Sequence, residues 1–116
     1  MNYVDGFICP VSNDNKDAYT AHAKEMGGLF KEYGALTFVD CWGDDVPEGK
    51  LTSFTLAVKR EESESVVFSW ITWPSKAVRD AGWKKLMEDP RMNSGSSPPF
   101  DGKRLMYGGF QVIAEY

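Results

Sequence analysis

The sequence predicts an α+β domain in which two helices cover one face of an antiparallel sheet. Three observations predict this: a length of 116 residues, which suits a single domain over residues 1–116, an alternation of strand-like and helix-like segments, and strands that are apolar on both faces. The segments follow one another as strand, helix, strand, strand, helix, strand. This order is the split βαβ arrangement of a ferredoxin-like fold.

The first strand and the first helix have recognisable boundaries. Residues 3–11 (YVDGFICPV) are apolar and aromatic and run into the polar SNDN, which predicts a strand, and Gly6 indicates a bulge or a close backbone approach. Residues 13–35 predict a helix, with Gly34 at its C-terminal end. One face of this helix is expected to be buried, because the following residues recur at three- and four-residue steps: Tyr19, His22, Met26, Leu29 or Phe30, and Tyr33.

The middle of the chain supplies two further strands. Residues 35–45 (ALTFVDCWGDD) predict the second strand, and residues 66–73 (VVFSWITW) predict the third. Between them, residues 53–59 (SFTLAVK) fit either a short strand or an extended excursion. The sequence therefore leaves the role of residues 51–64 open.

The last part of the chain predicts a helix, a loop and a strand. Ser75 is suited to cap a second helix, which is expected over residues 76–89. Residues 91–102 (RMNSGSSPPFDG) have the composition of a loop. Residues 103–116 (KRLMYGGFQVIAEY) predict the last strand, with a bulge at Gly108–Gly109.

The third strand is apolar on both faces. One face carries Val66, Phe68 and Trp70, and the other carries Val67, Ile71 and Trp73. A sheet with one wet face would alternate apolar with polar side chains, and two helices can cover only one face. A second copy of the chain, packed sheet against sheet, is the economical cover. The sequence therefore predicts a homodimer, and it leaves open which face meets the helices.

Composition and charge exclude several partners. The formal net charge is −4, whereas nucleic-acid-binding domains are usually basic, so no nucleic-acid partner is expected. There is no secretory leader and no apolar run near the ~20 residues that span a bilayer, so we expect no membrane partner and a cytoplasmic location. One histidine and two distant cysteines predict no metal site. No dinucleotide-binding or phosphate-binding motif is present, and no cofactor is expected.

Several blocks of the sequence resemble the DUF1428 family. They are YVDGF near the start, GAL and CWGDDVPEGK in the middle, VVFSWITWPSKAVRDAG and KKLMEDPRM, and PFDGKR and YGGF towards the end. The blocks occur in the right order over nearly the whole chain, which makes the resemblance specific. It implies membership of the dimeric α+β barrel superfamily, in which two ferredoxin-like protomers form a barrel from their sheets. It implies no particular activity.

The superfamily suggests where a ligand would bind. It includes antibiotic-biosynthesis monooxygenases, haem-degrading monooxygenases, muconolactone isomerases and ligand-sensing domains, and several members place a pocket between sheet and helices. This analogy implies a small-molecule ligand, although a fold alone does not fix a function. The haem-degrading members use an asparagine, a tryptophan and a histidine around haem. Here the first strand offers Asp5 and the second helix has no histidine, which disfavours haem.

The acidic stretch after the second strand is a first candidate site. Asp44 and Asp45 form a carboxylate pair, which suggests acid–base chemistry or a Mg²⁺ or Ca²⁺ site. Adjacent strand residues point to opposite faces, however, so the pair does not readily share one ligand. The alternative is a solvated turn at a strand end, with Trp42 packed in the core or the dimer interface and Cys41 a buried structural thiol.

A histidine and a set of aromatic side chains are the other candidates. His22 lies on the apolar helix stripe, and histidine suits general base catalysis near neutral pH, but a packed structural role fits equally. The aromatic candidates for a ligand site, or alternatively for core and interface, are Trp42, Trp70, Trp73 and Tyr107.

Two classes of function follow from these candidates. One is a cofactor-independent enzyme or small-molecule binder with an aromatic cleft between sheet and helices, where His22 or Asp44 supplies polarity. The other is a non-catalytic dimeric protein whose surfaces bind a partner.

Overall fold

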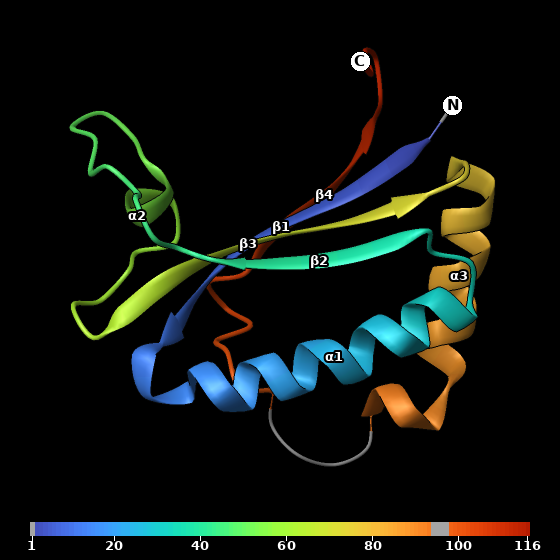
Figure 1. Cartoon of the computed structure of the whole chain (residues 1–116), viewed down its shortest axis with the longest axis horizontal. Coiled ribbons are helices and arrows are strands. Elements are labelled where there is room, and N and C mark those ends of the chain that lie inside the picture. Colours follow the sequence, from blue (N-terminus) through green and yellow to red (C-terminus); the bar gives the residue numbers. More distant parts are fainter. Residues whose placement is uncertain (1, 94–97) are drawn as a thin grey trace.

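The computed structural model of the chain describes residues 2–93 and 98–116. Its four strands are β1 (Tyr3–Ser12), β2 (Thr37–Trp42), β3 (Glu64–Trp73) and β4 (Met106–Gln111). They form one antiparallel sheet in the order β2-β3-β1-β4. The two long helices, α1 (Lys16–Glu32) and α3 (Lys76–Glu88), lie on the same side of this sheet (Figure 1). The predicted ferredoxin-like fold is therefore confirmed.

Local sequence explains where the long helices begin and end. A 3-10 turn, η1 (Asn13–Asn15), leads into α1, and the chain leaves α1 through Gly34, whose φ of 113° suits glycine. The side-chain oxygen of Ser75 accepts a hydrogen bond from the backbone N–H of Val78 at 3.1 Å, which caps α3 as predicted.

The structure corrects two predictions for the loops. Residues 53–59 are neither a strand nor an extended excursion, because they contain a short helix, α2 (Phe54–Ala57), which Ser53 caps by accepting a hydrogen bond from Leu56 N–H. The predicted loop at residues 91–102 begins inside a second 3-10 turn, η2 (Pro90–Asn93). Residues 94–97 of that loop lie outside the described residues.

The predicted bulge at Gly108–Gly109 is wrong. β1 and β4 pair in continuous register from Tyr3 with Gln111 to Ile8 with Met106, so Gly6 lies directly opposite Gly108. The glycines make room for side chains instead. A Cβ atom at Gly109 would overlap the Tyr3 hydroxyl, and one at Gly6 would lie 3.5 Å from the ring of Phe110.

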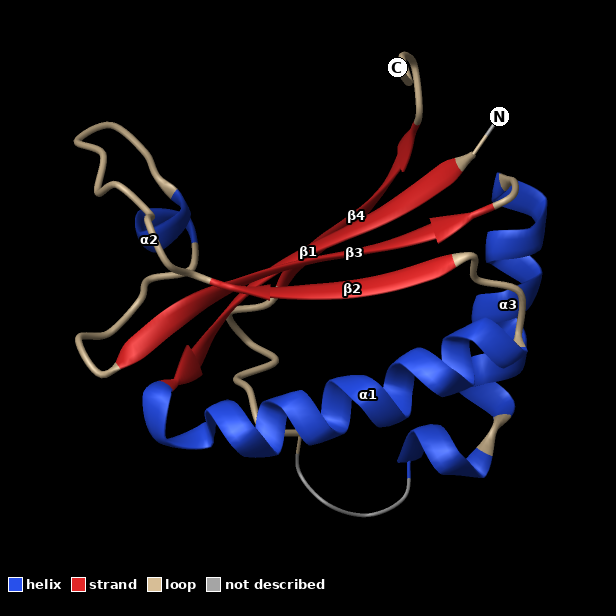
Figure 2. Ribbon diagram, viewed as in Figure 1, coloured by secondary structure: helices blue, strands red, loops and turns tan. Residues whose placement is uncertain are grey.

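The structure shows which of the two apolar faces of β3 meets the helices. Val67, Ile71 and Trp73 are buried in the core beneath α1 and α3. The opposite side, which we call the open face, carries Val4, Ile8, Phe68, Trp70, Met106 and Phe110. α2 covers only its end (Figure 2). There the rings of Phe54 and Phe68 meet edge to face with centroids 5.9 Å apart. Within the described residues, no helix is both long and apolar enough to span a bilayer.

Candidate functional site

A cavity of about 210 Å³ lies between the sheet and α1, and the segment that leads into β4 completes its wall. We call it the α1 cavity. Most of its wall is apolar, with contributions from Cys9, Met26, Phe30, Ile71, Phe100 and Leu105. Its polar side chains are Tyr19, His22, Asp40 and Ser69. A mostly apolar pocket with a few polar groups is typical of small-molecule sites.

Three of the polar side chains form one hydrogen-bonded group. Asp40 on β2 lies directly opposite Ser69 on β3, and both side chains point towards α1. Oδ1 of Asp40 accepts hydrogen bonds from the Ser69 hydroxyl and, at 2.7 Å, from the Tyr19 hydroxyl. Oδ2 of Asp40 accepts none from the described residues. This second oxygen is therefore available to a donor on a ligand.

The surroundings keep two acidic groups of the cavity protonated. Burial, reinforced by the hydrogen bond to Asp40, raises the pKa of Tyr19 far above its usual range, so its phenol remains a donor. Burial raises the pKa of Cys9 to about 11, partly offset by Tyr19 and increased by the charge of Asp40. At neutral pH Cys9 is thus a thiol rather than the thiolate that nucleophilic chemistry requires.

His22 lies half-buried in the wall of the α1 cavity. Its ring packs at a tilt against Phe100, with centroids 6.1 Å apart. Neither ring nitrogen hydrogen-bonds to a described residue. Within the described part of the chain, both nitrogens can therefore bond to a ligand or water without losing a protein partner.

Asp44 lies elsewhere. Asp44 and Asp45 are both exposed beyond the end of β2, and neither contributes to the wall of the α1 cavity. The carboxylate that does so is Asp40, four residues earlier. Among the described residues, no three His, Cys, Asp or Glu side chains gather closely enough to hold a metal ion.

The four aromatic candidates occupy different places. Trp73 is fully buried in the core, whereas Trp70 lies on the open face and also borders the α1 cavity. Trp42 is half-buried on β2, with the Lys16 ammonium 5.4 Å above its ring. Tyr107 is 76% exposed on the edge strand β4. The structure therefore does not assemble these four side chains into one aromatic site.

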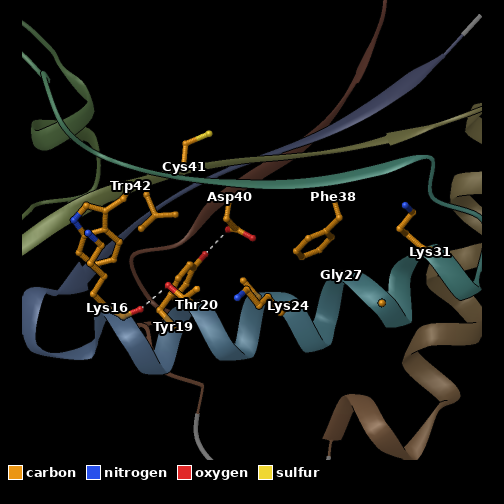
Figure 3. Close-up of a pocket in the computed structure, with 13 residues that line it drawn as sticks. Lys16, Tyr19, Thr20, Lys24, Gly27, Lys31, Phe38, Asp40, Cys41 and Trp42 are labelled. Atoms are coloured by element: carbon orange, nitrogen blue, oxygen red, sulfur yellow. Dashed lines mark hydrogen bonds between the residues drawn. The ribbon is translucent and has the colours of Figure 1, made fainter.

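A second hollow, of about 430 Å³, runs between α1 and the edge strand β2 (Figure 3). We call it the edge cleft. It shares Tyr19, Phe38 and Asp40 with the α1 cavity. Figure 3 shows the Tyr19 hydroxyl reaching up from α1 to the carboxylate of Asp40. The hydrogen-bonded pair therefore stands in the wall between the two hollows.

A different carboxylate, Asp5, is buried but already fully bonded. Its Oδ2 accepts the indole N–H of Trp73 at 2.9 Å and that of Trp83 at 2.8 Å, and its Oδ1 accepts a 2.7 Å hydrogen bond from Arg79. Its side chain is only 3% exposed. The hydrogen bonds to Asp5 also raise the pKa of Arg79. With both oxygens bonded inside the fold, Asp5 serves to join β1, β3 and α3.

Sequence reasoning placed His22 on the helix face that lines the cavity, but it did not single out Asp40 or Ser69. One signal could have pointed to Asp40. It alternates with Phe38 and Trp42 along the predicted strand, so it is a lone charge on an inward-facing row, where a charge needs partners. The pairing with Ser69 depends on strand register, which the residues do not reveal by themselves.

The chain matches known proteins over most of its length. The family model described as "Protein of unknown function (DUF1428)" matches residues 2–102. "Uncharacterized protein YbaA" of Escherichia coli (strain K12) is 59% identical over 116 residues, which cover 99% of each chain. The protein of the same name from Shigella flexneri has the same identity and coverage.

Two solved structures share the fold. One is a Bacillus cereus protein provisionally assigned as an antibiotic biosynthesis monooxygenase, with a TM-score of 0.59 and 10% identity over 99% of this chain and 96% of that chain. The other is Rv0793 from Mycobacterium tuberculosis, with a TM-score of 0.54 and 12% identity over 99% of this chain and 98% of that chain. At these identities the likeness shows the fold alone.

Proposed function

The chain belongs to the DUF1428 family, and we propose that it is a small-molecule-binding protein whose ligand occupies the α1 cavity. One observation carries the proposal: an apolar wall that is interrupted by the bonded group of Tyr19, Asp40 and Ser69 and by His22. Such buried polar groups fix the orientation of a ligand, while the apolar wall supplies most of the binding energy.

The free polar atoms define the chemistry of the ligand. Oδ2 of Asp40 requires a hydrogen-bond donor, such as a hydroxyl or an N–H group. The aromatic and aliphatic wall requires a compact apolar body, and the volume of about 210 Å³ suits a single ring. His22 is the side chain suited to exchange a proton with such a molecule, should the protein act as a cofactor-independent enzyme. The B. cereus structure, provisionally a monooxygenase, is compatible with a small-molecule ligand on this fold.

We expect ring compounds that carry a hydroxyl or N–H donor to raise the melting temperature of the wild-type protein by several degrees. A ligand at ~100 times its Kd stabilises the folded state by ~2.7 kcal/mol. His22→Ala should abolish this shift and leave the unliganded stability within ~1 kcal/mol of wild type, because the described residues provide no hydrogen bond to lose. Thermal melts of both proteins against a fragment library measure this.

Replacing the Asp40 carboxylate by an amide tests whether the melting-temperature shift depends on this side chain. Asp40→Asn keeps an oxygen that can accept from Tyr19 and Ser69 but replaces Oδ2 by a donor, so donor ligands should lose their shift. Asp44→Asn is the matched control, because Asp44 is exposed beyond the cavity, and it should retain the shift. The proposal fails if Asp44→Asn and Asp40→Asn behave alike.

The alternative function is that of a non-catalytic dimeric protein. For it, we propose a homodimer formed through the open face. Three of its side chains are largely uncovered in the single chain: Phe110 is 61% exposed, Met106 is 46% exposed and Phe68 is 43% exposed. They surround a hollow of about 460 Å³. Contiguous apolar surface of this kind marks an interaction site, and a second identical face is complementary to it in a two-fold dimer.

Phe110→Asp is expected to convert the dimer into a monomer. The charge would be buried without a partner in the interface, while in the single chain it would remain exposed to solvent. Light scattering coupled to gel filtration should give twice the chain mass of 13.0 kDa for wild type and one chain mass for the variant. Met87→Asp, at a 65% exposed apolar residue of α3 on the other side of the sheet, should stay dimeric. A wild-type protein that is monomeric at every concentration would contradict the proposal.

A further inference from the structure

The charges of α1 are sorted between two sides of the helix. Each of its three lysines is followed directly by an acidic residue, in the pairs Lys16–Asp17, Lys24–Glu25 and Lys31–Glu32. Consecutive helical residues are ~100° apart around the axis, so the three lysines share one side and the three acids share another. All three lysines line the edge cleft, and none of the three acids does.

The edge cleft is hollow because the α1 residues that line it between the lysines include small ones. Ala23, Gly27 and Gly28 contribute to its α1 side, and apart from the neighbouring residues and backbone of α1 no described atom lies within 4 Å of the place where a Cβ atom of Gly28 would be. Phe38 and Trp42 supply apolar surface from β2 (Figure 3). The volume of about 430 Å³ falls within the usual range for small-molecule sites, ~300–1,000 Å³.

The lysines are not neutralised within the described part of the chain. Lys16, Lys24 and Lys31 form no ion pair there, and Lys16 instead lies over the ring of Trp42. Asp40 is the one carboxylate among the cleft's lining residues, and one of its oxygens is occupied by Tyr19 and Ser69. The cleft is thus positively charged in a protein whose formal net charge is −4.

We propose that the edge cleft binds an organic anion, with a carboxylate or phosphate ester held by the lysine row and an apolar ring against Phe38 and Trp42. Lys24 lies ~12 Å from Lys16 and ~10 Å from Lys31 along the helix axis, so the central lysine can share one anion with either neighbour. Asp40 repels the acidic group from the middle of the cleft and orients the ligand towards a lysine. This proposal does not rest on a ligand in the α1 cavity.

Isothermal titration with three matched probes tests it: benzoate, phenyl phosphate and neutral benzamide. At least one of the two anions should bind, benzamide should not, and the affinity should fall as salt is added. Amide chemical shifts should place the anion at residues 37–42 of β2. The variant Lys16→Gln/Lys24→Gln/Lys31→Gln should bind the anion about tenfold more weakly or worse, because charge-assisted hydrogen bonds are lost.

A charge-matched variant separates this site from general attraction. Lys50→Gln/Lys84→Gln/Lys103→Gln changes the net charge by the same amount at exposed lysines outside the cleft, and it should bind like wild type. Equal loss in both triple variants, equal binding of benzamide, or no binding of either anion at millimolar concentration would overturn the proposal. The anion that binds more tightly shows whether the ligand carries a carboxylate or a phosphate ester. His22→Ala should not alter this affinity, so failure of the α1 cavity proposal is distinguishable.

Discussion

Replacing Asp5 with alanine is expected to lower the free energy of unfolding by ~3–5 kcal/mol. Asp5 is 2% exposed, and its carboxylate receives the two indole N–H groups and the Arg79 guanidinium. Its removal leaves two indole N–H donors without an acceptor and leaves the Arg79 guanidinium with the exposed Asp80 as its remaining carboxylate. Urea unfolding followed by tryptophan fluorescence measures the loss, since Trp73 and Trp83 report on this cluster.

The control is Asp80, the second carboxylate that pairs with Arg79. Asp80 accepts from Nη1 of Arg79 at 3.0 Å, but its side chain is 50% exposed, so solvent screens the pair. Asp80→Ala should therefore destabilise the protein far less than Asp5→Ala. Asp5→Asn should fall between the two, because an amide oxygen still accepts from the indoles. If the Asp5 and Asp80 variants unfold at the same urea concentration, the buried cluster contributes nothing beyond a surface pair.

Gly82→Ala is expected to destabilise the protein by ~1–3 kcal/mol, although alanine is the better helix former by ~1 kcal/mol. A Cβ atom at Gly82 would lie 2.7 Å from the ring of Trp73 and 2.8 Å from the backbone oxygen of Tyr33. Neither group can move away easily. The Trp73 ring is fully buried and hydrogen-bonded to Asp5, and the Tyr33 oxygen belongs to the backbone. Gly82 therefore allows α3 to approach the core closely.

Gly28→Ala, in the other long helix, should have the opposite sign. Apart from the neighbouring residues and backbone of α1, no described atom lies within 4 Å of a Cβ at this position, so only the helix preference remains and stability should rise by up to ~1 kcal/mol. Paired thermal melts of the two variants give the comparison. A rise in the melting temperature of Gly82→Ala would show that the helix can shift away from Trp73 at little cost.

The main elements were predictable because their signals are local. Ser75 marks the start of α3, Gly34 follows the end of α1, and the helical period places His22 on the buried side. The two apolar faces of β3 are visible in simple alternation. A four-residue helix such as α2 is too short for any periodicity, which is why residues 53–59 remained undecided.

The polar contacts were not predictable, because they join distant parts of the chain. Asp40 meets Ser69 through the register of β2 with β3, and Asp5 meets Trp83 across 78 residues of sequence. Arg79 pairs with Asp80, its neighbour in sequence. The structure shows that Arg79 also reaches the buried Asp5. The pair Gly108–Gly109 was predicted to form a bulge for the same reason. The long-range contact that explains Gly109, its close approach to the Tyr3 side chain, is not visible in the sequence.

The position of β1 has a consequence for how the protein emerges from the ribosome. β1 is synthesised before the other three strands, and its two partners among the described residues are β3, which begins at Glu64, and β4, which begins at Met106. At ~5–20 residues per second, the nascent chain carries β1 without a partner for several seconds. Its apolar side chains are then open to chaperones and to neighbouring nascent chains. A chain that stops before β4 would keep one edge of β1 bare, which makes premature termination an aggregation hazard.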